Sequence, residues 1–105
     1  MEVRPKLTWF PTDQCFIGGC WVAPKSGERL PLEDPSRGVE MGAIARGANA
    51  DIDDAVAAAE RALAGDWGHL TATERGRLMM RLSALILERV DDLARIEATD
   101  VGKPI

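Results

Sequence analysis

The chain has 105 residues, of which 46% are hydrophobic and 29% charged, a composition typical of one globular domain rather than of a disordered segment. Its net charge is −4, with 13 Lys and Arg scattered among 17 Asp and Glu, so neither nucleic acid nor an anionic membrane is an expected partner. No apolar run approaches the ~18 residues of a membrane span, and residues 1–10 lack the apolar run of a secretory signal. We therefore expect a cytoplasmic protein.

Short strands separated by turns are predicted for the first half of the chain. Aromatic and β-branched residues gather in three segments, CFIGGCWV (15–22), ERLPLE (28–33) and VEMGAIA (39–45). Turn residues separate these segments at PKSG (24–27) and DPSRG (34–38). The second segment is expected to be the return strand of the first, and Pro31 places it at an edge or a bulge because proline cannot donate to a ladder. Residues 16–45 are thus predicted to form a small antiparallel hairpin region.

The two cysteines, Cys15 and Cys20, lie within this strand region. Their C-x4-C spacing is neither the CxxC of a redox centre nor half of a zinc site, and His69, the only histidine, is far along the sequence. Neither thiol has a neighbouring histidine or helix N-terminus to activate it as a nucleophile. We expect ordinary reduced thiols.

Apolar residues take a helical period from residue 49 onward, and residues 49–101 are predicted to be helical. Asn49 or Asp51 is expected to cap the first helix, which ends at Gly65. The second helix spans residues 71–90 and opens with the capping box TATE, in which the first Thr and the Glu satisfy each other's backbone N–H groups.

Apolar side chains occupy two opposed faces of the helix at 71–90. At 100° per residue, one stripe about 140° wide holds Leu78, Met79, Leu82, Leu85, Ile86 and Val90. Met80 and Leu87 fall together on the far side, so the helix is expected to need partners on both faces. Gly76 lies inside this helix at a cost of roughly 1 kcal/mol relative to Ala, which we interpret as a close approach by another element.

A third helix is predicted from about Asp91 to Thr99, closing at Gly102. The final residues, DVGKPI, are typical of a helix that exits into a loop, because glycine accepts a positive φ there and proline cannot continue the helix. We expect the sequence to be part of a longer chain.

Several segments, taken in order and spacing, resemble one known family. They are FIGGCWV (16–22), SGERLPLEDPSRG (26–38), GAIARGANADIDDAVAAAERAL (42–63), Trp67, ERGRLMMRLSALI (74–86) and DVGKP (100–104). This ordered set resembles the N-terminal segment of NAD(P)-dependent aldehyde dehydrogenases over about residues 16–104. Gly18, Cys20 and Asp34 depart from the usual family residues at strand and turn positions, which bears on the subfamily more than on the family.

The resemblance implies an α/β fold in which short antiparallel strands precede three helices, as the N-terminal part of a Rossmann-type cofactor domain. Residues 1–105 then form one partial domain of a chain several times longer. The family chemistry is attack of a cysteine thiolate on an aldehyde, hydride transfer to NAD(P), and thioester hydrolysis by water that a glutamate activates. The residues for these steps lie beyond the matching segment, so we assign no catalytic or cofactor-binding residue here and expect no NAD(P) on the isolated chain.

The resemblance also implies one partial metal site. In some family members a monovalent cation lies against backbone carbonyls at the positions of Leu32 and Glu33 and a carboxylate at the position of Asp100, with a further ligand from later in the chain. Oxygen atoms are the ligands that a hard cation prefers. The other interpretation is that Asp100 only shapes the turn before Gly102.

Two functions from different classes remain open at this point. In the first, the chain is the N-terminal portion of an aldehyde dehydrogenase, inactive alone, whose partner is the remainder of the dehydrogenase chain or a homo-oligomer. In the second, it is a non-enzymatic interaction module that binds a partner, or itself, through the exposed apolar face of helix 71–90. A self-sufficient module is expected to be monodisperse and to melt cooperatively, whereas an orphaned fragment is expected to aggregate or be molten.

Overall fold

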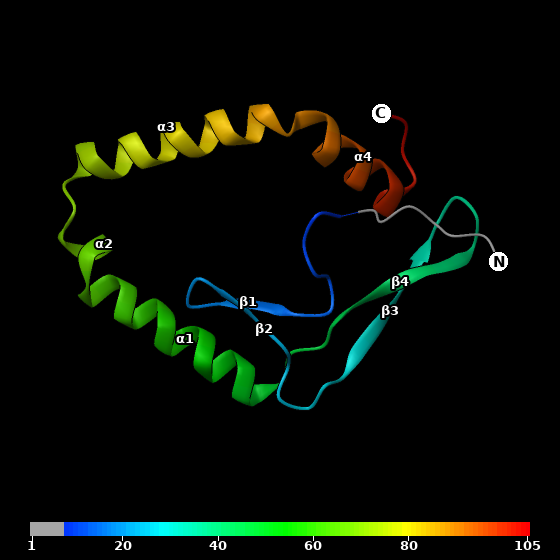
Figure 1. The fold of residues 1–105 in the computed structure, drawn as a ribbon, viewed down its shortest axis with the longest axis horizontal. Helices are drawn as coiled ribbons and strands as arrows, with labels where there is room; N and C mark the ends of the chain where they lie inside the picture. The colour runs from blue at the N-terminus through cyan, green and yellow to red at the C-terminus, as the bar shows by residue number, and fades with distance from the viewer. Residues whose placement is uncertain (1–7) are drawn as a thin grey trace.

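A computed structural model describes residues 8–105 (Figure 1). Its elements are β1 (Cys15–Ile17), β2 (Cys20–Val22), β3 (Arg29–Asp34), β4 (Val39–Ala45), α1 (Asn49–Ala64), α2 (Asp66–His69), α3 (Ala72–Glu88) and α4 (Val90–Val101). Antiparallel strands therefore precede the helices, which confirms the α/β class. The three expected helices are α1, α3 and α4, and the single turn α2 is an addition that the sequence pattern did not indicate.

The strands form two separate two-stranded antiparallel sheets, β1–β2 and β3–β4. Gly18 and Gly19 have φ of +62° and +79°, so they form a two-residue turn that brings Ile17 opposite Cys20. The prediction that residues 28–33 return along the first strand is wrong, because this turn already folds residues 15–22 back on themselves. The β3 strand pairs with β4 instead.

Pro31 lies in β3, which among residues 8–105 pairs with β4 alone. The register of this sheet is irregular between Leu32 and Glu33, whose partners are Gly42 and Glu40, so that Met41 is skipped. The edge position expected for the proline strand is confirmed, since proline lacks the N–H that a second partner strand would need. The extra residue of the irregularity, Met41, lies in β4, so the bulge is in the partner of the proline strand.

The helix boundaries follow from their caps. In α3, Thr71 Oγ1 accepts a hydrogen bond from the Glu74 N–H at 3.2 Å and Glu74 Oε2 accepts one from the Thr71 N–H at 2.7 Å, which confirms the capping box. Gly65 follows α1, and Gly102 closes α4 with φ +76°. The cap expected at Asn49 or Asp51 is wrong by one to three residues: Ala48 holds the N-cap position, and Asp51 accepts a hydrogen bond from its N–H at 3.0 Å.

The described chain is an open arch. The two long helices α1 and α3 form its limbs, and α2 joins them at one end (Figure 1). The β1–β2 hairpin lies beside α1, and the β3–β4 sheet lies at the end opposite α2 (Figure 1). Its extents are 51 × 35 × 20 Å, and its radius of gyration of 17.2 Å exceeds the ~13 Å of a compact domain of 100 residues. Among residues 8–105 no large apolar side chain is buried, and no helix is long and apolar enough to cross a membrane.

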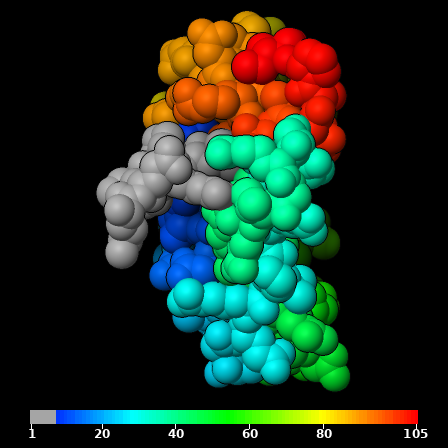
Figure 2. Space-filling view, turned by 90° about the vertical axis from the view of Figure 1, so that its right-hand side faces the viewer, coloured from blue at the N-terminus to red at the C-terminus, as the bar shows by residue number. Residues whose placement is uncertain are grey.

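Two contacts position the parts of the arch. The tip of the β1–β2 hairpin lies on α1, where a Cβ on Gly18 would come 3.9 Å from the Cβ of Ala58. At the other end, α4 packs on β3, and the C-terminal residues lie against the turn between β3 and β4 (Figure 2). A Cβ on Gly102 would come 3.1 Å from Cγ of Pro35, so this approach is close. The α3 helix makes no substantial packing contact with any other described element.

Candidate functional site

Asp34 organises the turn between β3 and β4. Asp34 as a residue is 6% exposed. Its carboxylate accepts hydrogen bonds from the N–H groups of Ser36 at 2.9 Å and Arg37 at 3.3 Å, and its Oδ2 lies 3.3 Å from Nε of Arg37. Burial acts to raise the pKa of Asp34, but these hydrogen bonds and the Arg37 charge outweigh it and hold the pKa below its usual value. The turn is therefore built around an ionised carboxylate.

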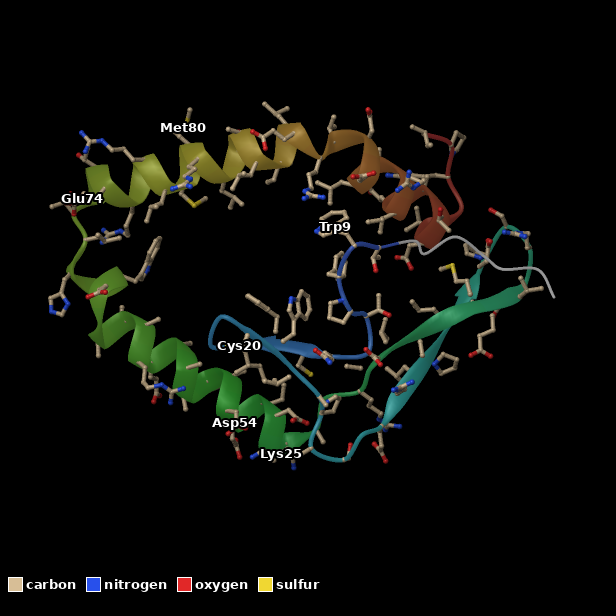
Figure 3. All side chains as sticks on the ribbon, viewed as in Figure 1. Trp9, Cys20, Lys25, Asp54, Glu74 and Met80 are labelled. Atoms are coloured by element: carbon tan, nitrogen blue, oxygen red, sulfur yellow. The ribbon has the colours of Figure 1, made fainter. Side chains whose placement is uncertain are left out.

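Asp51 organises the start of α1 in the same way, with a carboxylate that accepts backbone hydrogen bonds. The residue is 5% exposed, and its carboxylate accepts hydrogen bonds from the N–H groups of Ala48 at 3.0 Å and Lys25 at 3.1 Å. These two bonds, the Ala48 one first, lower the pKa of Asp51 against the opposing effect of burial. Lys25 also pairs with Asp54 at 3.1 Å, on the outer side of α1 (Figure 3). The turn at residues 24–27 is thus fixed to the helix.

A cleft of about 900 Å³ opens between residues 8–13, the β3–β4 sheet and α4. Three arginines line it, and each is neutralised by an aspartate: Arg29 with Asp13 at 3.0 Å, Arg37 with Asp34 at 3.3 Å and Arg95 with Asp92 at 3.1 Å. Paired charges leave the cleft without a strong field of either sign. It has the character of a polar packing surface more than of an anion site.

Of the residues expected to hold a cation, Leu32 lines this cleft, whereas Glu33 and Asp100 are not among its lining residues. Leu32 lines it together with Thr99, the residue before Asp100, while Leu32 and Glu33 flank the irregular point of the β3–β4 register. Asp100 is exposed in the last turn of α4, and within residues 8–105 its carboxylate has no hydrogen-bond or ion-pair partner. No cluster of three or more His, Cys, Asp or Glu side chains suited to a metal occurs in the described part of the chain.

The two cysteines are both free thiols, Cys15 half-buried and Cys20 exposed. Cys15 packs near Gly47, where a Cβ would come 3.8 Å from its Sγ. His69 is engaged elsewhere, with Nδ1 2.7 Å from the Gly65 carbonyl oxygen, so it donates to that oxygen. Nothing among residues 8–105 combines a thiol with a general base.

A row of aromatic rings crosses from the sheet to the helices. Phe10 stacks on Trp21 at a centroid distance of 5.7 Å and meets Trp9 edge-on at 5.3 Å. The Arg89 guanidinium lies over the Trp9 ring at 4.6 Å. Arg89 is also the residue between α3 and α4, with non-helical φ −115° and ψ 18°. The junction of these helices is thus anchored to the N-terminal segment, a link that the sequence pattern did not indicate.

Comparison with known proteins places this arrangement in a family. The profile of the aldehyde dehydrogenase family matches residues 21–105. The chain is 43% identical to mouse mitochondrial 10-formyltetrahydrofolate dehydrogenase, over 85% of this chain and 10% of that protein. It is 41% identical to 3-sulfolactaldehyde dehydrogenase of Pseudomonas putida, over 88% of this chain and 19% of that protein.

Solved structures agree with these sequence matches. A point mutant of the aldehyde dehydrogenase of Bacillus cereus superposes with a TM-score of 0.87 at 34% identity, over 99% of this chain and 22% of that one. PnpE, solved in complex with nicotinamide adenine dinucleotide, gives a TM-score of 0.79 at 37% identity, over 85% of this chain and 18% of that one. The chain spans about a tenth to a fifth of these relatives.

The chain therefore belongs to the aldehyde dehydrogenase family, and its interpretation as the N-terminal portion of such an enzyme is confirmed. Within that portion, sequence reasoning identified Asp51 as a residue of the helix start but missed the contacts that join distant segments. Asp51 bonds Lys25 across 26 positions, and Trp9 contacts Arg89 across the arch. The one available signal was an acidic residue in the first turn of a helix, which predicts a role at the helix end but not a second partner.

Proposed function

We propose that this chain is the N-terminal portion of an NAD(P)-dependent aldehyde dehydrogenase, which oxidises an aldehyde to a carboxylic acid. Its part in that enzyme is a scaffold: the sheets and the helices α1, α3 and α4 frame one side of a Rossmann-type cofactor domain. NAD(P), when bound by the complete enzyme, supplies the hydride acceptor. The 105 residues alone are expected to oxidise no aldehyde, since neither thiol has an activating neighbour among the described residues. They are also expected to bind no NAD(P), because the nucleotide-contacting residues of the family lie outside the matching segment.

One observation supports this proposal above the others. The chain follows the fold of the Bacillus cereus enzyme over nearly its whole length, yet none of its large apolar side chains in residues 8–105 is buried. Burial of apolar surface is the main favourable term in folding, so an open arch of this kind is not expected to be a complete structural unit. The arch fits the role of an outer layer laid over a larger core.

A chimera tests the scaffold function directly. The matching segment of the Bacillus cereus enzyme is replaced by these 105 residues, and NADH formation is followed with an aldehyde that the parent enzyme oxidises. Because every catalytic group in the chimera comes from the Bacillus part, we expect a loss of no more than about tenfold in rate, or about 1.4 kcal/mol.

Two controls accompany the chimera. The Bacillus enzyme without any N-terminal segment, and the isolated 105-residue chain, are both expected to show no activity. A soluble, folded chimera that does not oxidise the aldehyde would contradict the scaffold function. Aldehyde oxidation by the pure 105-residue chain would contradict the proposed inactivity.

The partner and the compartment belong to the same proposal. The remainder of a dehydrogenase chain is the proposed partner, within an enzyme that assembles as a homo-oligomer in the cytoplasm. The free thiols of Cys15 and Cys20 suit a reducing compartment, where unpaired cysteines persist. Cell fractionation checks the location, and light scattering of the active chimera checks the assembly state.

We also propose that the complete enzyme holds a monovalent cation at Leu32, Glu33 and Asp100. Support comes from the packing of α4 on β3 and from the unpartnered Asp100 carboxylate within residues 8–105. The donors are two backbone carbonyls and one carboxylate, which are the oxygen ligands that a hard cation takes, and the remainder of the chain supplies the rest. The cation would hold the end of α4 against β3.

Thermal unfolding of the chimera tests this cation site without relying on activity. Sodium or potassium chloride is expected to raise the melting temperature above that in choline chloride of equal ionic strength, since only the small cations bind. Asp100→Asn should abolish this difference, while Asp92→Asn, on the same helix, should keep it. A melting temperature that is insensitive to the choice of cation would contradict the site.

A further inference from the structure

The large apolar side chains of α3 have no partner in the described chain. Leu78, Leu82 and Leu85 are 45%, 49% and 50% exposed, although they lie on one stripe of the helix. Met80 lies on the opposite side and points away from the strands and from α1 (Figure 3). By the helical rotation of 100° per residue, the stripe therefore faces the space enclosed by the arch.

The α1 helix has one face that packs on the hairpin and another, apolar face that is exposed. It approaches the β1–β2 hairpin at Ala58, and both Ala58 and Ala55, on the same side of the helix, are half-buried. Ile52, Val56 and Leu63 lie on another face and are 59%, 52% and 72% exposed. Asp54 is on roughly the opposite side of the helix from these three and points out of the arch (Figure 3). The apolar stripe of α1 thus also faces the enclosed space.

The shape of the arch and the length of its relatives identify what covers both stripes. Both stripes are exposed and face the same space, so one body seated between α1 and α3 can cover both. The solved Bacillus cereus chain keeps the same arch, at a TM-score of 0.87, and this arch is 22% of that chain. Most of the residues that can fill the arch therefore come from the rest of a dehydrogenase chain.

The geometry points to the stripes of α1 and α3 as one docking surface for the remainder of an aldehyde dehydrogenase chain, held by noncovalent contacts alone. This inference rests on the proposed function and goes beyond it. It states that the 105 residues stay bound to the remainder as a separate polypeptide. A split enzyme made of two chains is then a working enzyme.

A cleavable form of the chimera tests the docking surface. A protease site is inserted directly after Ile105, the folded chimera is cut, and size-exclusion chromatography separates bound from free segment. We expect the segment to co-elute with the remainder and the cut enzyme to keep its activity. Dissociation of the segment upon cutting would overturn the inference.

Matched variants show whether the stripe is the surface. Leu82→Asp places a charge in the stripe and should raise the dissociation rate of the cut segment about tenfold or more, because a buried unpaired charge is costly. Met80→Asp, on the opposite face, should leave the rate unchanged. If the aspartate at 82 prevents folding of the chimera, Leu82→Ala is expected to give a smaller increase in the same direction. Equal effects at positions 80 and 82 would overturn the assignment.

The remaining outcomes separate this inference from its rivals. An uncut chimera without activity contradicts the proposed function. An active uncut chimera whose segment leaves on cutting contradicts the docking inference alone. A stable dimer of the isolated 105-residue chain, abolished by Leu82→Asp and detected by sedimentation, would assign the surface to a second copy and overturn the choice of occupant.

Discussion

Loss of the Asp51 carboxylate is expected to loosen the contact between the start of α1 and the turn at residues 24–27. The carboxylate joins the turn at Lys25 to the first turn of α1 through two backbone hydrogen bonds, and these bonds lower its pKa. A carboxylate whose pKa is lower in the folded state contributes stability that is present above its unfolded value of 3.8. That contribution is lost as the pH falls through the lowered pKa. Acid should therefore free the start of α1 from the turn.

We predict that the amide protons of Lys25 and Ala48 shift together as the pH falls from about 5 to about 2, because both donate to the carboxylate that becomes protonated. The measurement is an NMR titration of the chimera with these 105 residues isotopically labelled, because the isolated chain is not expected to hold the Lys25–Asp51 contact in place. Asp51→Asn should remove this shared movement. Asp53→Asn, an exposed neighbour in the same helical turn, should preserve it. Unchanged titration of the two amides in Asp51→Asn would contradict the assignment.

Two glycines of the helices are predicted to respond oppositely to alanine. Gly102 has φ +76° and its Cβ position lies 3.1 Å from Pro35, so Gly102→Ala should cost about 1–2 kcal/mol and fray the end of α4. A Cβ at Gly76 meets no described atom within 4 Å, so the close approach expected there is wrong within residues 8–105. Gly76→Ala should therefore favour α3 by about 1 kcal/mol. Far-ultraviolet circular dichroism of the isolated chain should show less helix in the first and more in the second. A loss of helix in Gly76→Ala would contradict the open space.

The junction of α3 and α4 is the element on which the direction of the α3 stripe depends. The α4 helix packs on β3. The α3 helix, which joins α4 through Arg89, makes no substantial packing contact of its own with the other described elements. The guanidinium of Arg89 rests on Trp9, which is 47% exposed. This cation–π contact thus helps to fix the angle at which α3 leaves α4.

We predict that Arg89→Gln exposes the Trp9 ring. In a background with Trp21→Phe and Trp67→Phe, the fluorescence of Trp9 should become more accessible to acrylamide when the guanidinium is removed. Arg95→Gln, which breaks only the pair with Asp92, should leave the quenching unchanged. Equal quenching in both variants would show that Arg89 does not cover the ring.

Local signals explain which elements were predictable from the sequence. The capping box at Thr71 and Glu74 and the glycines at 65 and 102 fixed the helix ends, because each acts within a few residues. The prediction that residues 28–33 pair with the first strand is wrong because the tight Gly18-Gly19 turn pairs β1 with β2 before the chain reaches the longer connection at 24–27. The contacts of Asp51 and Trp9 depend on the tertiary structure, and the cation ligands at 32, 33 and 100 came only from the family resemblance.

At the scale of the whole molecule, the open arch has a thermodynamic consequence. Helix caps and hairpin turns are satisfied locally, so secondary structure is expected to form in the isolated chain. Cooperative melting requires a packed core, and none of the large apolar side chains in residues 8–105 is buried. The isolated chain should therefore have native-like secondary structure without fixed tertiary packing.

We predict that the isolated chain gives a helical far-ultraviolet spectrum, binds the dye ANS and shows no sharp calorimetric transition, because its apolar stripes are exposed to water. The cut chimera, in which the same 105 residues lie against the remainder, should bind little ANS and melt in one cooperative step. The comparison uses one sequence in two surroundings, so it isolates the contribution of the missing partner. A sharp transition and no ANS binding by a monomeric isolated chain would instead indicate a self-sufficient interaction module, because such a chain would have to bury its own stripes.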